Sequence, residues 1–161
     1  MAEGLPPQES GLWQDWVHFL RAYKVVIERV SQDLAESGMP TLIEYSVLWW
    51  LSYSEDQRVR LVDLSKGVLV SKSRVTRLMN SLVEQGWVQR EQAFADKRVT
   101  YASLTERGRE VLEEATPAFT LAFNRYFASQ LAGHFGELAK LLGPMATQLE
   151  PIPAHATGSQ A

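Results

Sequence analysis

A short helix with clearly marked ends, joined directly to two β-rich runs, restricts the fold of this chain more than any other feature. Residues 71–86 read SKSRVTRLMNSLVEQG, so the helix opens on Ser71 and closes on Gly86. Serine and glycine supply the start and stop chemistry of a helix. The runs 87–92 and 99–104 flank the tip AFADKR, which predicts a hairpin. With a short helix expected over 61–68, this order is typical of a winged helix-turn-helix.

The helix over 71–86 has an apolar face and a polar face. The apolar residues have the spacing of one buried face: Val75, Leu78, Met79, Leu82 and Val83. The other residues are small polar or cationic, which suits base edges and phosphates in a major groove: Lys72, Ser73, Arg74, Thr76, Arg77 and Asn80. We expect Arg74 and Arg77 to contact phosphates or guanine edges, and Lys72 to lie near a phosphate at the helix N-terminus. A polar helix face by itself is more often simply solvated.

The hairpin adds the cationic residues Arg90, Lys97 and Arg98 to this surface. An aspartate two residues before an arginine can restrain its guanidinium or cap the turn, so we assign Asp96 a structural role. A positioned arginine suits the narrow minor groove, and we therefore assign Arg98 a DNA contact. Two interpretations of Arg90 stand equal: a phosphate contact, or pairing in the neighbourhood of Glu91.

The charge distribution favours the same region. The whole chain has a net charge of −3, which argues weakly against nucleic acid. Residues 66–109, however, contain nine Lys/Arg and four Asp/Glu, a net charge of +5, whereas the remainder carries −8. A cationic segment between acidic flanks is typical of a DNA-binding surface, with the flanks facing away from the phosphates.

The flanking segments predict helices. A heptad-like seam over 12–36 predicts one long helix: Trp13, Trp16, Leu20, Tyr23, Ile27, Val30 and Leu34. Its apolar surface is too large for one small domain to cover, which indicates an intersubunit or interdomain core. The pattern Thr41-x-x-Glu44 is a capping box for a helix over 42–52, followed by a polar turn over 52–58. Thr105 is a good N-cap for a helix from Glu106, and a last helix is expected over about 133–148.

The sequence therefore predicts a mainly α-helical protein with a small β-hairpin wing. We expect one domain over 12–149, in which 41–105 form the winged helix-turn-helix and 12–36 and 106–149 form a helical dimerisation region. The segments 1–11 and 150–161 are polar or rich in proline and glycine, and we expect them to be disordered.

Composition excludes several kinds of chemistry. The chain has no cysteine, which excludes disulfides, cysteine metal sites and thiol switches. The histidines His18, His134 and His155 have no metal-ligand spacing, so we expect no metal and no cofactor. No arrangement of residues suits nucleophilic or phosphate chemistry, and we expect no catalytic site. Neither a signal peptide nor an apolar run of roughly 20 residues is found, which predicts a cytoplasmic protein without membrane association.

The segment DKRVTYASLTERGREVLEEA resembles the wing signature of the MarR family (multiple antibiotic resistance regulators), which is Asp-x-Arg, a short strand, then Leu-Thr-x-x-Gly. The matching positions are Asp96, Arg98, Leu104, Thr105 and Gly108. The preceding SRVTRLMNSLVEQGWVQR resembles the recognition helix and first wing strand of that family, and the helix order matches from about Leu12 to Leu149. Two departures are visible: Phe-Ala precedes Asp96 where acidic residues and proline are usual, and the short helix has Leu-Ser-Lys-Gly where Leu-Ala-Glu is usual.

The resemblance implies a homodimer shaped like a flattened triangle, in which the first and last helices interlock. It also implies binding to pseudo-palindromic promoter DNA, usually as a repressor, and release when a small anionic or phenolic compound binds between the dimer region and the winged domain. Aromatic stripes on helices are more often plain core than pocket. The candidate ligand-binding residues for an aromatic effector are Trp16, Phe19, Arg21 and Trp49.

A different hypothesis is a protein-interaction module, in which a helical dimer uses its winged domain to bind a protein. The overall acidity and the long apolar first helix allow it. A DNA-binding dimer instead requires two recognition helices about 34 Å apart, in successive major grooves.

Overall fold

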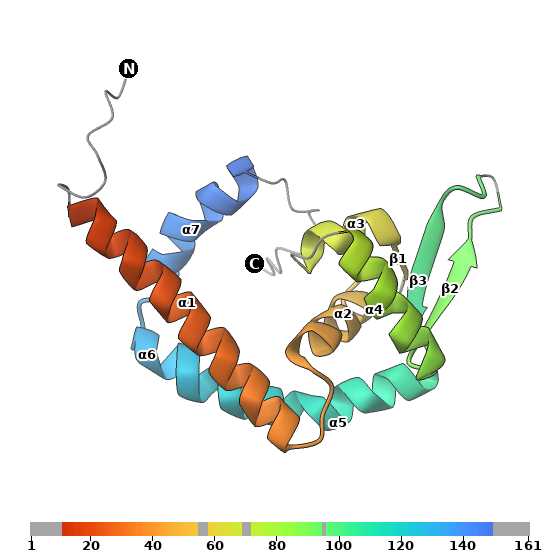
Figure 1. Ribbon diagram of the computed structural model, residues 1–161, viewed down its shortest axis with the longest axis horizontal. Helices are drawn as coiled ribbons and strands as arrows, with labels where there is room; N and C mark the ends of the chain where they lie inside the picture. Colours follow the sequence, from red (N-terminus) through yellow and green to blue (C-terminus); the bar gives the residue numbers. More distant parts are fainter. Residues whose placement is uncertain (1–10, 55–57, 69–71, 95, 150–161) are drawn as a thin grey trace.

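The computed structural model describes residues 11–54, 58–68, 72–94 and 96–149, except the side chains of 72, 73 and 146–149. The chain forms mostly helices, with one small sheet (Figure 1). The elements in order are α1 (Gly11–Glu36), α2 (Leu42–Ser52), β1 (Arg58–Arg60), α3 (Leu61–Gly67), α4 (Lys72–Glu84), β2 (Val88–Gln92), β3 (Thr100–Leu104), α5 (Glu106–Phe123), the π-helical η2 (Asn124–Ala128), α6 (Ser129–Leu131) and α7 (Phe135–Leu149). The fold class predicted from the sequence is confirmed.

The expected disordered segment 1–11 is too long by one residue, because Gly11 begins α1. Residues 1–10 and 150–161 lie outside the described residues.

The sheet is antiparallel and has three strands in the order β1-β3-β2. The sequence predicted only the hairpin of β2 and β3, in which Val88 pairs with Leu104 and Gln92 with Thr100. The third strand, β1, was missed because it has only three residues and its first, Arg58, ends the segment expected to be a polar turn. It pairs with β3, with Arg60 opposite Tyr101.

The helix boundaries follow the capping chemistry of the sequence. The capping box of α2 is confirmed, because the backbone N–H of Thr41 donates to Glu44 Oε2 at 2.9 Å and the hydroxyl of Thr41 accepts from the backbone of Glu44 at 3.3 Å. Gly86 follows α4 with a φ of 72°, the left-handed conformation in which glycine ends helices. Ser71, the expected start of the same helix, lies outside the described residues.

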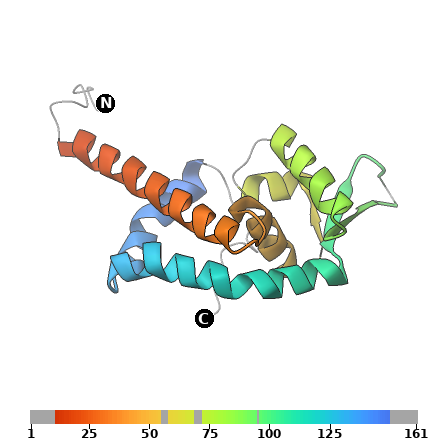
Figure 2. The ribbon, with the colours of Figure 1, turned by 60° about the horizontal axis from the view of Figure 1, so that its bottom comes forward.

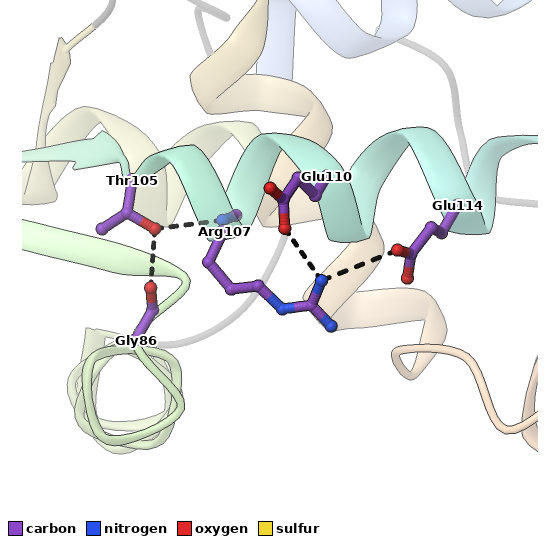
Figure 3. A network of polar contacts seen from close by, with 6 residues as sticks. Gly86, Thr105, Arg107, Glu110 and Glu114 are labelled. Carbon is purple, nitrogen blue, oxygen red and sulfur yellow. Dashed lines mark hydrogen bonds and ion pairs between the residues drawn. The ribbon is translucent and has the colours of Figure 1, made fainter.

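Thr105 joins three elements at one point (Figure 3). Its hydroxyl donates to the carbonyl of Gly86 at 2.6 Å and accepts from the backbone N–H of Gly108 at 3.0 Å. Its own backbone N–H donates to the carbonyl of Trp87 at 3.0 Å. A Cβ at Gly108 would overlap that same carbonyl oxygen, so only glycine fits there. The end of α4, the end of the hairpin and the start of α5 are therefore held together.

The main core lies between the winged region and α5. From α4 it receives the buried Val75, Met79 and Leu82, with Leu78 partly buried. The prediction that Val83 belongs to this face is wrong: its side chain is 40% exposed, because it lies at the edge of the apolar stripe, one position beyond Leu82. From α2 the core receives five buried residues: Tyr45, Val47, Leu48, Trp50 and Leu51.

The helical end of the molecule lies opposite the wing, as both ribbon views show (Figures 1 and 2). Here α1 packs along α5 and η2 around the buried Val30, Leu34 and Ala122. Many large apolar side chains of α1 and α7 remain exposed: Leu12, Trp13, Trp16, Phe19, Leu20, Tyr23, Val25, Ile27, Phe135, Leu141 and Met145. In the described part of the chain, no helix combines the length and apolarity required to cross a membrane.

Candidate nucleic-acid interface

Helix α4 and the wing strand β2 lie side by side, at the end of the molecule away from α1 and α7 (Figure 1). The apolar face of α4 is buried against the core, so its other face is left to solvent. The exposed side chains of that face are Arg74, Thr76, Arg77 and Asn80. Lys72 and Ser73 belong to the first turn of the helix, but their side chains lie outside the described residues. The structure thus brings the candidate residues of the helix together on the side away from the core.

Arg90 is tied to the recognition helix itself. Its Nη2 donates to Oδ1 of Asn80 at 2.8 Å. In β2, Arg90 pairs with Ala102, whose side chain is buried. Because side chains alternate across a strand, Arg90 lies on the sheet face toward α4. Of the two interpretations from the sequence, pairing near Glu91 is wrong, since Glu91 lies on the opposite face; a phosphate contact by Arg90 stays a prediction.

Asp96 holds Arg98 at the tip of the wing in two ways. Its Oδ1 accepts from the backbone N–H of Arg98 at 3.0 Å and from Nε of the same residue at 3.1 Å. The bond from the Arg98 side chain, and then the one from its backbone, lower the pKa of the Asp96 carboxyl below its usual value. Asp96 makes both of the contacts expected of it, to the guanidinium and to the turn backbone, and its structural role in the wing stays a prediction. The Arg98 side chain nevertheless remains 92% exposed. Its guanidinium is therefore held in one orientation and still accessible to a ligand from solvent. Lys97 is exposed beside it.

A cleft of about 360 Å³ lies between the wing and the two helices of the helix-turn-helix. Its lining contains Arg98 from the wing, Thr76 from α4 and Arg60 from β1. The sequence pattern did not indicate Arg60, because the strand that holds it was not predicted. Arg60 Nε donates to the Tyr101 hydroxyl at 3.4 Å, and this bond raises the pKa of the Arg60 guanidinium, with a smaller contribution from the charge of Asp63.

The four residues proposed for an effector do not converge. Phe19 lines an apolar cavity of about 530 Å³, and Trp49 lines a different cavity of about 360 Å³. Trp16 stacks on Phe19 with ring centroids 6.0 Å apart and lies outside the lining of both cavities, as does the exposed Arg21. The sequence missed the aromatic residues of α5 and η2 that line the larger cavity: Phe119, Phe123, Tyr126 and Phe127. Their regular spacing of three and four residues was the available signal.

Comparison with known proteins decides the family. A family model described as the MarR family matches residues 41–100. The chain is 35% identical over 125 residues to YkoM, an uncharacterized HTH-type transcriptional regulator of Bacillus subtilis, covering 77% of this chain and 79% of the relative. This chain belongs to the MarR family. Its winged helix-turn-helix and the Asp96–Arg98 pair are therefore those of a MarR transcriptional regulator.

Solved structures agree over nearly the whole MarR fold. AbsC, a MarR family transcriptional regulator from Streptomyces coelicolor, is 30% identical with a TM-score of 0.79, covering 92% of this chain and 98% of AbsC. Sco3205, another MarR family regulator of that organism, was solved in complex with DNA. It is 26% identical with a TM-score of 0.80, covering 98% of this chain and 96% of Sco3205.

Proposed function

We propose that this protein is a cytoplasmic homodimer that binds pseudo-palindromic operator DNA and represses transcription until a small aromatic ligand releases it. The observation on which the proposal depends is the exposed polar face of α4 lying beside the wing, to which Asn80 and Arg90 join it. Short polar and cationic side chains of α4 can reach base edges and phosphates in the major groove. The Arg98 guanidinium, held by Asp96 at 3.1 Å, suits the adjacent minor groove. Sco3205, which has a similar fold and was solved in complex with DNA, supports the proposal that this chain binds DNA.

The dimer is supported by the apolar surface of α1 and α7. Exposed patches of this kind mark protein–protein interfaces, and Trp16, Tyr23 and Leu141 are all exposed within a single chain. A two-fold axis through this end would place the two α4 helices on the outer parts of the dimer. Such a pair can enter successive major grooves about 34 Å apart. The two-fold symmetry of the dimer then requires two half-sites in a palindromic arrangement.

The ligand proposal depends on the cavity of about 530 Å³. Its walls come from both parts of the molecule, because Leu42 and Ser46 belong to α2 of the winged region and Val26 belongs to α1. The aromatic side chains of α5 and η2 supply apolar walls, and polar groups such as Gln130 can orient a ligand hydroxyl or carboxylate. A ligand seated there can bias the position of the winged region relative to the dimer region, provided that it binds one arrangement more tightly.

The decisive experiment is fluorescence anisotropy with duplexes from the region upstream of the protein's own gene. We expect saturable binding that weakens steeply with salt, because phosphate contacts release counterions. Arg98→Ala should weaken binding and leave the dimer intact in sedimentation. A well-folded dimer that ignores every such duplex at low salt would overturn the DNA proposal and favour a protein partner for the winged domain.

The ligand and the direction of regulation need separate measurements. Thermal-shift screening against aromatic carboxylic acids and phenols should find compounds that raise the melting temperature. A bound ligand stabilises the folded protein by a free energy of RT ln(1 + [L]/Kd). The same compounds should lower affinity for the operator, because linkage between the two sites is reciprocal. Deletion of the gene should raise transcription from the bound promoter; a fall in transcription would show activation in place of repression.

A further inference from the structure

Strand β1 places two arginines around a single aromatic ring. Val59 between them is buried, so Arg58 and Arg60 both lie on the outer face of the sheet. The Cζ of Arg58 lies 4.8 Å from the centroid of the Tyr101 ring, and that of Arg60 lies 5.9 Å from it. Contacts of this length between a guanidinium and an aromatic ring are attractive. Tyr101 therefore restrains two positive charges on the edge of the wing.

Only one of the two arginines borders the cleft beside the helix-turn-helix. Arg60 lines the cleft of about 360 Å³ together with Thr76 of α4 and Arg98 of the wing, whereas Arg58 does not line it. In addition, Nε of Arg60 donates to the Tyr101 hydroxyl at 3.4 Å. This bond uses Nε and leaves the terminal amino groups of the guanidinium for a second acceptor. The carboxylate of Asp63, which also acts on Arg60, is the acidic group that a ligand would have to tolerate there.

The position of the cleft determines what would enter it. If α4 occupies a major groove and Arg98 the next minor groove, a sugar-phosphate strand must pass between them, since that strand separates the two grooves. The cleft lies between these two contacts. Arginine binds phosphate well because its planar fork of donors matches the phosphate oxygens, and a guanidinium already restrained by Tyr101 loses less conformational freedom on binding.

We propose that Arg60, positioned by Tyr101, binds a backbone phosphate of the DNA strand that crosses the cleft between α4 and the wing. The inference rests on the proposed DNA-binding function and adds to it a third contact, from β1. A phosphate contact carries no sequence information, so Arg60 sets affinity and register while the side chains of α4 read bases.

Arg60→Gln and Arg58→Gln provide a matched test. Each removes one positive charge from the same three-residue strand and the same ring, so the long-range change in charge is equal. Binding of the full-length protein to its upstream duplex is measured by anisotropy across a series of KCl concentrations. We expect Arg60→Gln to reduce the slope of log K against log[salt] by about 0.9 for each protomer bound, and Arg58→Gln to keep the wild-type slope. Affinity for unrelated duplexes should fall in the same proportion in Arg60→Gln.

Identical salt slopes in the wild type and in both variants, Arg58→Gln and Arg60→Gln, would overturn this inference. The proposed function would still stand. Equal reductions of the slope in the two variants would also overturn it. They would indicate that both arginines act by long-range electrostatic attraction, without a specific phosphate contact by Arg60. A wild-type protein that binds no duplex would overturn the proposed function itself.

Tyr101→Phe separates positioning from fold. It keeps the ring and removes the hydroxyl that accepts from Arg60. We expect weaker binding than wild type, with a smaller loss than in Arg60→Gln, and a wild-type salt slope because the charge remains. Thermal melting of all three variants should match wild type. A lower melting temperature in Arg60→Gln with an unchanged salt slope would mean that Arg60 acts only in the fold, and would overturn the proposal.

Discussion

The Nη2 atom of Arg90 donates a hydrogen bond of 2.8 Å to Oδ1 of Asn80, which links wing strand β2 to the recognition helix. Both side chains are exposed on the surface proposed to face DNA. Asn80 therefore has a structural partner as well as a possible base or phosphate partner, and Arg90 is held close to the helix. The two residues should act as a unit when DNA binds.

A double-mutant cycle tests this coupling. We expect Asn80→Ala and Arg90→Ala each to weaken operator binding, and the double variant to weaken it by less than the product of the two effects. The discrepancy should be about 2- to 10-fold, as expected for one hydrogen bond between side chains in contact. Operator affinity by anisotropy at fixed salt is the measurement. Strictly multiplicative effects would show that the hydrogen bond has no part in DNA binding.

Asp96→Asn tests whether orientation of Arg98 matters beyond its charge. The variant removes the ion pair at 3.1 Å and leaves the arginine in place. We expect weaker operator binding than wild type despite the more positive wing, because Arg98 then loses its restraint. Arg98→Ala should weaken binding further. Tighter operator binding by Asp96→Asn would show that net charge outweighs orientation at the wing tip.

The Asp96 carboxyl also predicts a pH dependence. Its pKa is lowered in the folded protein by the Arg98 side chain and then by the Arg98 backbone N–H. A lowered carboxyl pKa stabilises the folded wing at pH values above the usual aspartate pKa of about 3.9, and this contribution is lost as the pH falls through the folded value. Carboxyl ¹³C titration by NMR should give a value below 3.9 for Asp96. The control is Arg98→Ala, in which the Asp96 pKa should move back upward; an identical value in both proteins would refute the assignment.

Gly108→Ala should destabilise the protein. The new Cβ would overlap the carbonyl oxygen of Trp87, so the junction of α4, the hairpin and α5 would have to shift. We expect a loss of roughly 1–3 kcal/mol in the free energy of unfolding, the usual range for overpacking. Gly136→Ala is the control, because nothing lies within 4 Å of the added Cβ there. Urea unfolding of both variants gives the comparison; equal midpoints would contradict the close approach.

Leu141→Glu should separate the protomers. Leu141 of α7 is 69% exposed in the single chain, and a charge placed in an apolar interface is costly to desolvate. We expect sedimentation velocity to show a monomer for this variant and a dimer for wild type. Phe94→Glu makes a similar change at a fully exposed position of the wing and should remain a dimer. Dimeric Leu141→Glu would place the interface elsewhere.

The sequence predicted best those features that depend on neighbouring residues. The capping box at Thr41, the glycine stop at Gly86 and the Asp96–Arg98 restraint all involve partners close in the chain, so their geometry follows from local spacing. Strand β1 was missed because its short run becomes a strand only by pairing with β3, about forty residues later. Arg60 was missed for the same reason.

The remaining differences concern which side chains meet across elements. The bond between Arg90 and Asn80 depends on how α4 packs against the sheet, which the sequence does not specify. The effector candidates Phe19 and Trp49 line separate cavities because α1 and α2 present them to different sides of Phe119, a residue common to both linings. Periodicity identifies an apolar stripe, but only packing determines which part of it borders a cavity.

The position of Thr105 makes α5 a lever. The helix starts where that hydroxyl clamps the end of α4, and it extends over 18 residues, or about 27 Å at 1.5 Å per residue, toward the helical end that packs on α1. A small change in the tilt of α5 at its far end would become a larger displacement at the clamp. We therefore expect that a ligand that rearranges the aromatic residues around Phe119 and Phe123 moves the winged region as a rigid unit.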